Sequence, residues 1–154
     1  MKPVENRDLD LAKTKLMEDD LCLVIVKNGK VIFETKKRGI GGFIEAIDEV
    51  HQNLVAASVA DKVIGVAAAM LCAYSGVSSV FALTISEGGA KTLEANNITY
   101  VFEEKVSNIL NRDKTDVCPF EKLAMSSESP DDAYVKLLSL ARKLVTKPEK
   151  ADCV

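Results

Sequence analysis

The longest stretch without a charged side chain, residues 63–86, constrains the fold more than any other feature of the sequence. It is long enough to span a bilayer as one helix. However, Ser75 and Gly76 interrupt it, and its two parts differ: the first is rich in alanine, and the second, Val80–Ile85, is β-branched and aromatic. A buried helix followed by a buried strand explains both parts. We therefore predict a globular domain that does not enter a membrane.

A hairpin is indicated earlier in the chain. Leu21–Lys27 is a continuous apolar run, and Val31–Thr35 is a second strand pattern. Asn28 and Gly29 lie between them and are typical of a two-residue turn, because both turn positions require a positive φ. Helical periodicity predicts one helix before the hairpin, over residues 8–17, and one after it, over residues 43–52.

Helices and strands alternate in the second half. Ser58 and Asp61 form a capping-box pattern, which predicts a helix from Ser58 to about Tyr74 that stops at Gly76. The other predicted elements are a strand over 80–85, a helix over 86–97, a strand over 98–102, one or two helical turns over 106–110, and helices over 119–124 and 129–145. Helices between successive strands require parallel crossovers. The fold class is therefore α/β: a three-layer α/β/α sandwich with a mixed sheet of four or five strands.

Composition limits the domain organisation and the classes of function. The 154 residues, with a net charge of −3, fit one domain over residues 1–145 and a flexible C-terminal tail over residues 146–154. The mild acidity gives no electrostatic signature of nucleic-acid binding. Four cysteines without a CxxC pair, and no signal peptide, predict a reduced, cytoplasmic protein. A single histidine disfavours a zinc site, and we expect no cofactor.

Three segments together resemble a known family. They are Ala60–Ala69, Ser86–Gly88 and residues 111–121, the last running from Asn111-Arg112 to Cys118-Pro119-Phe120-Glu121. They are similar to the motifs of a small family catalogued as a domain of unknown function with a cytidine-deaminase-like fold. The resemblance spans residues 21–144, and it implies a cytidine-deaminase-like topology for this chain.

The resemblance does not extend to zinc chemistry. Zinc deaminases place a His or Cys, with a Glu two residues later, at one helix start and a P-C-x-x-C motif at the next. The corresponding segments of this chain, Val59–Lys62 and Ser86–Ala90, contain neither histidine nor cysteine. These segments therefore supply no side chains that could bind a zinc ion and so activate a water molecule. We therefore expect no zinc-dependent deamination.

The predicted helix starts indicate a site for a small anion, nucleotide-like or phosphorylated. Helix N-termini offer free N–H groups and positive potential, and they face the cleft at the ends of the strands. The candidate ligand-binding residues are Lys62, Ser86, Glu87, Gly88 and Arg112. Asp61 and Ser86 have a purely structural alternative as helix caps. The basic cluster Lys36–Arg38 could hold a phosphate beside the cleft, but it is also typical of a solvated turn.

Cys118 is a candidate nucleophile. It precedes Pro119 at the start of a predicted helix, a position that lowers the pKa of a thiol. Asp61 or Glu121 could then transfer the proton. The alternative is a half-buried cysteine that stabilises a loop. Cys22 and Cys72 lie in apolar runs and are predicted to be core residues.

Three functions remain open from the sequence. The first is a binding domain that holds a small anionic ligand in a deaminase-like cleft. The second is a metal-independent enzyme with Cys118 as nucleophile and Asp61 or Glu121 for proton transfer. The third is an interaction protein in which the apolar central helix supports a homodimer and the cleft is vestigial. Whether the protein is an enzyme is therefore left undecided at this point.

Overall fold

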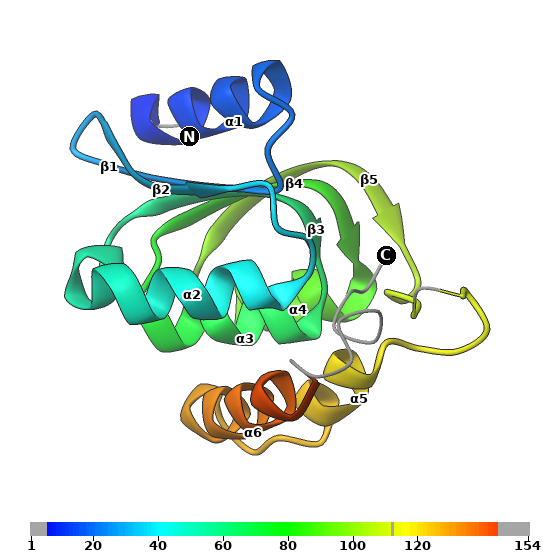
Figure 1. The fold of residues 1–154 in the computed structure, drawn as a ribbon. Helices are drawn as coiled ribbons and strands as arrows, with labels where there is room; N and C mark the ends of the chain where they lie inside the picture. The colour runs from blue at the N-terminus through cyan, green and yellow to red at the C-terminus, as the bar shows by residue number, and fades with distance from the viewer. Residues whose placement is uncertain (1–5, 112, 145–154) are drawn as a thin grey trace.

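The computed structural model describes residues 6–111 and 113–144, and this part contains a mixed five-stranded sheet and six α-helices (Figure 1). The strands are β1 (Leu23–Lys27), β2 (Lys30–Thr35), β3 (Ser58–Ile64), β4 (Ser79–Ser86) and β5 (Thr99–Val106). The helices are α1 (Arg7–Glu18), α2 (Ile40–Val50), α3 (Val66–Ser75), α4 (Glu87–Ala95), α5 (Pro119–Met125) and α6 (Pro130–Leu144), with a 3-10 turn over His51–Leu54. The tail predicted for residues 146–154 lies outside the described residues.

The sheet has the order β2-β1-β3-β4-β5. Strand β1 is antiparallel to both β2 and β3, whereas β3, β4 and β5 are parallel to one another. Helices α3 and α4 make the two crossovers between the parallel strands. The predicted α/β fold with a mixed sheet is therefore confirmed.

Helices cover both faces of the sheet. Helix α1 packs on one face, where Val24 and Val26 of β1 join its buried cluster. Helices α2, α3 and α4 lie on the other face (Figure 1). Leu23 and Ile25 of β1 belong to the buried cluster on that side. Helices α5 and α6 pack outside α3 as a further tier. The central strands are buried on both faces, which explains why residues 63–86 carry no charge.

The uncharged stretch forms a core helix and a strand, as its two parts predict. Helix α3 has only ten residues and ends at Gly76 in the left-handed conformation. In the part of the chain that the structure describes, no helix has the length and apolar character to cross a membrane.

The hairpin forms at the predicted turn. Asn28 and Gly29 have φ values of 53° and 77°, as a type I′ turn requires. The carboxylate of Asp8 accepts both turn N–H groups, from Asn28 at 3.0 Å and from Gly29 at 2.9 Å. These two hydrogen bonds hold the turn against the start of α1.

The prediction of a helix that starts at Ser58 is wrong for its first turns. Residues 58–64 form β3, and the helix begins only at Val66. Asp61 is paired with Leu23 of β1 and with Ala82 of β4, so backbone pairing on both sides satisfies this segment. The Ser58 hydroxyl bonds the Ser79 hydroxyl at 2.8 Å and caps no helix. Pairing with two strands outweighs a local capping pattern.

The helical turns predicted for residues 106–110 are also absent. Strand β5 continues to Val106, four residues beyond its predicted end. Leu110 then forms a β-bridge with Val117, and the Cys118 N–H donates to the Ile109 carbonyl at 2.9 Å. This pairing across the loop uses the backbone groups that a helical turn would need. The predicted starts of α4, α5 and α6 are confirmed.

Candidate functional site

A pocket opens beside the end of β3, between the segments that lead into α2, α3 and α5. Its cavity volume is about 100 Å³. Apolar side chains of α2, β3, α3 and α5 form most of the wall. The polar and titratable lining residues are Cys22, Arg38, Asp61, Lys62, Cys118 and Glu121. The carboxyl ends of parallel strands are where open α/β sheets usually bind ligands.

Asp61 is the polar group of β3 in this pocket. It shares the strand face of Val59, which belongs to the core beneath α2 and α3. One of its carboxylate oxygens accepts the Val63 N–H at 3.1 Å. Burial raises the pKa of Asp61 to about 7, although backbone hydrogen bonds from Val63 and Lys62 act in the opposite direction. Near neutral pH this carboxyl group therefore exists both protonated and ionised.

The two cations of the pocket differ in availability. Lys62 is next to Asp61 in β3, but its amine forms an ion pair with Asp20 at 2.6 Å. Arg38 lies just before α2, is exposed, and makes no ion pair with any residue that the structure describes. Arg38 is therefore the cation that an incoming anion would meet.

Glu121 has a structural partner inside the protein. Its side chain is buried, and its two oxygens accept the N–H groups of Val66 and Ala67, each at 2.7 Å. These are the first N–H groups of α3, whose N-cap, Gly65, has no side chain to bond them. Burial raises the pKa of Glu121 against these two hydrogen bonds. The anion position at the tip of α3 is thus filled by a carboxylate from α5.

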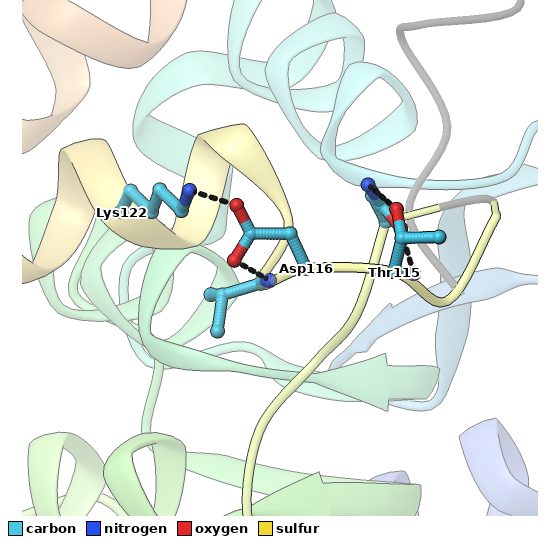
Figure 2. A network of polar contacts seen from close by, with 5 residues as sticks. Thr115, Asp116 and Lys122 are labelled. Carbon is cyan, nitrogen blue, oxygen red and sulfur yellow. Dashed lines mark hydrogen bonds and ion pairs between the residues drawn. The ribbon is translucent and has the colours of Figure 1, made fainter.

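The loop before α5, which leads to the pocket residues Cys118 and Glu121, is held by polar contacts. Figure 2 shows those of Thr115, Asp116 and Lys122. Thr115 donates its N–H to the Asn111 side chain at 3.0 Å. The Asp116 carboxylate bonds the Lys122 amine of α5 and accepts the Val117 N–H at 2.7 Å. The loop is therefore joined at both ends, to Asn111 and to α5. Arg112, predicted to bind the ligand, lies outside the described residues.

The tip of α4 does not line the pocket, so Ser86, Glu87 and Gly88 are not brought together with Asp61 and Cys118. The Ser86 hydroxyl accepts the Gly89 N–H at 2.9 Å as a helix cap. A Cβ atom at Gly88 would come within 2.7 Å of the Val66 side chain, and one at Gly89 within 2.8 Å of the Ile64 carbonyl oxygen. These glycines let α4 pack against the connection between β3 and α3.

Two of the cysteines, Cys22 and Cys118, differ from the prediction made for them, whereas Cys72 does not. Cys118 lines the pocket and is the N-cap of α5, but it is buried and disulfide-bonded, so it presents no thiolate in this state. Cys72 is a buried, free core residue, as predicted. Cys22, predicted to be core, is half-buried and free, and it lines the pocket. Burial raises the pKa of Cys22, and the charges of Lys62 and Arg38 only partly counteract this effect.

Among the described residues, no group of three or more Cys, His, Asp or Glu side chains is arranged to hold a metal ion. Asp61 and Glu121 approach the same cavity, but each is hydrogen-bonded to backbone N–H groups.

The fold and the pocket define a small α/β domain with a polar site at the end of β3, the central strand of its sheet. A family model described as "TM1506: Domain of unknown function (DUF1893)" matches residues 11–139, and the chain belongs to this family. The match includes all three motifs on which the resemblance was based, and it confirms the resemblance to a family of unknown function.

A solved structure supports the same assignment. The crystal structure of the DUF1893 family protein TM1506 from Thermotoga maritima is similar to this chain, with a TM-score of 0.81 and 29% sequence identity. The similarity covers 90% of this chain and 92% of that one. No curated protein matches the chain.

Proposed function

We propose that this DUF1893 domain binds a small anionic ligand in the pocket between β3, α2 and α5. One observation carries the proposal: a cavity with apolar walls contains Asp61, whose pKa is about 7, together with Arg38, a cation that has no ion pair in the described part of the chain. Apolar walls with a few convergent polar groups are the usual composition of small-molecule sites.

The charge and the volume of the pocket limit which ligands it could bind. Lys62 is paired with Asp20, and Glu121 fills the tip of α3, so Arg38 is the positive group left for the ligand. The cavity of about 100 Å³ is smaller than the roughly 300–1,000 Å³ of sites for drug-sized molecules. A nucleotide would place only one part in the cavity and leave the rest outside, whereas a small metabolite would fit whole.

We also propose that the fold is cytidine-deaminase-like but supports no zinc-dependent deamination. A hairpin followed by alternating helices and strands is the topology that the family resemblance implies. Helix α1, the sheet and helices α2 to α4 would correspond to the three layers, with α5 and α6 added outside α3. The starts of α3 and α4 carry no histidine or cysteine, and Glu121 occupies the first of them. A fold shared with the deaminases therefore does not imply their reaction here.

A thermal-shift screen tests the binding proposal. The panel contains small carboxylates, phosphorylated metabolites and nucleoside monophosphates. A ligand present at 100 times its Kd adds about 2.7 kcal/mol to the stability of the folded state. For a domain of this size that corresponds to a rise in Tm of roughly 5–10 °C.

The variant Arg38→Gln is expected to lose most of this rise. Lys36→Gln is the matched control, because Lys36 belongs to the same basic cluster but does not line the pocket. The proposal fails if no compound of the panel raises Tm, or if the same compounds stabilise Arg38→Gln as much as the unmodified protein.

A further inference from the structure

We infer that the ligand of the pocket is a small monocarboxylate, and that Asp61 binds it as a neutral carboxylic acid that donates a hydrogen bond to the ligand's carboxylate. One proton is then taken up with each ligand molecule. The inference rests on the proposed function, because it concerns the same pocket. It adds the chemical class of the ligand and the protonation state of the residue that recognises it.

The geometry around Asp61 leaves one oxygen for this role. Its Oδ1 accepts the Val63 N–H at 3.1 Å, and the Lys62 N–H, although close to this carboxyl group, donates to the Cys22 carbonyl oxygen at 3.1 Å. The carboxyl group has no ion pair with any described residue. The neighbouring Lys62 extends to Asp20 instead. A carboxyl group beside an apolar cavity and without a counter-ion favours its neutral form, which is consistent with its pKa of about 7. The proton then resides on Oδ2 and makes this oxygen a donor.

Cys22, Cys118 and Glu121 also line the pocket, and their surroundings differ from those of Asp61. Burial raises the pKa of Cys22 above that of an ordinary thiol, so this side chain stays neutral. Cys118 is disulfide-bonded and does not titrate. Glu121 accepts two N–H groups of α3, which favour its ionised form and partly offset the effect of burial, which raises its pKa. Asp61, with a pKa of about 7, therefore changes its charge between pH 6 and 8.5.

The charge balance favours a carboxylate over a phosphate. Arg38 offers one positive charge, which matches a monoanion. A phosphate monoester carries about −1.5 to −2 charges at pH 7, and it would lie beside Asp61 and Glu121 with too few cations. A neutral Asp61 removes the repulsion that a carboxylate would otherwise meet. Carboxylic acids kept neutral by an apolar site donate to oxyanions in this way elsewhere.

The size and the walls of the cavity agree with a short hydrocarbon chain. A dry cavity of about 150 Å³ is known to admit benzene, and this one is somewhat smaller. Ile40, Val63, Ala68 and Phe120 line it with apolar atoms. A three-carbon acid such as propionate is therefore a suitable probe.

Amide-resonance NMR titrations with sodium propionate, and separately with inorganic phosphate, test the inference at pH 6.0, 7.0, 7.5 and 8.5. For the unmodified protein we expect propionate to bind more tightly than phosphate. We expect its apparent Kd to rise roughly tenfold between pH 7.5 and 8.5, because one proton must be restored to Asp61 for each ligand bound.

Two variants assign the effect to Asp61. Asp61→Asn keeps an acceptor for the Val63 N–H and a donor for the ligand, so propionate should bind it with a Kd that does not change over this pH range. Glu87→Gln removes an exposed carboxylate outside the pocket, and it should keep the full pH dependence.

The outcomes separate the inference from the proposed function. Binding of propionate with a pH-independent Kd, or an undiminished pH dependence in Asp61→Asn, overturns the inference and leaves the binding proposal standing. Tighter binding of phosphate also overturns it. If neither probe nor any compound of the thermal-shift panel binds, both the inference and the proposed function are wrong.

Discussion

Replacing Gly65 with alanine is expected to destabilise the protein by about 3–5 kcal/mol, although the backbone there is ordinary for alanine, with φ of −106°. The reason is the Glu121 cap. A Cβ atom at position 65 would lie 2.0 Å from the Glu121 Oε1, so the carboxylate would have to leave. The N–H groups of Val66 and Ala67 would then lose charged partners inside the core, at about 1.5–3 kcal/mol for each hydrogen bond.

A double-mutant cycle distinguishes this cause from general crowding. Glu121→Ala is expected to destabilise the protein by a similar amount, because it leaves the same two N–H groups unpaired. In the Glu121→Ala background, Gly65→Ala should cost less than about 1 kcal/mol, since the clash is gone. Urea denaturation measures the four stabilities. Additive costs would show that Gly65 and Glu121 act independently, contrary to the geometry described above.

Asp61→Asn is expected to make the protein more stable at pH 8 and to have little effect at pH 4. The pKa of an unfolded aspartate is about 3.9, whereas that of Asp61 in the folded state is about 7. Between these values the folded state binds more protons than the unfolded state, so the unmodified protein loses stability as pH rises from about 4 to 7. Above pH 7 the loss is complete and constant.

The asparagine variant has no proton to lose, so it avoids this loss. Three pKa units correspond to about 4 kcal/mol, and partial solvation of the half-buried side chain reduces the expected gain at pH 8 to about 2–4 kcal/mol. Urea denaturation of both proteins at pH 4.0, 6.0 and 8.0 measures the difference. A difference that does not grow with pH, or a variant that is less stable at pH 8, contradicts the assignment of a raised pKa to Asp61.

Short sequence motifs correctly predicted those elements whose ends depend on neighbouring residues in the chain. Asn28-Gly29 fixes the hairpin turn, and Pro119 and Pro130 open α5 and α6 where the sequence predicts. The Ser58–Asp61 segment is the opposite case. It has a good local capping pattern, but its backbone pairs with β1 and β4, which are distant in sequence. Pairing of this kind is a tertiary property that no local pattern contains.

The candidate site could be predicted in part. The sequence indicates Asp61 in one motif and Cys118 and Glu121 in another, and the structure places all three at one cavity. Their roles were harder to derive, because the cap that Glu121 forms on α3 depends on how α5 packs against α3.

Two further pocket residues were harder to assign from the sequence: Cys22 was predicted to be core, and Arg38 was indicated only as part of a basic cluster that could also be a solvated turn. Cys22 and Arg38 reach the pocket through the pairing of β1 with β3 and through the approach to α2, both of which are non-local. The basic cluster before α2 was the one available signal for Arg38. The tip of α4 was assigned to a cleft on the assumption that both helix starts face it. Instead, Gly88 and Gly89 pack directly against the connection between β3 and α3.

A carbon-13 NMR titration of the Asp61 side-chain carboxyl tests whether this group has a pKa near neutrality and recognises an anion. The account predicts a pKa of about 7 in the free protein, and a higher pKa with saturating propionate, because the bound anion favours the protonated form. A pKa near the ordinary value of about 4, unchanged by propionate, would contradict it.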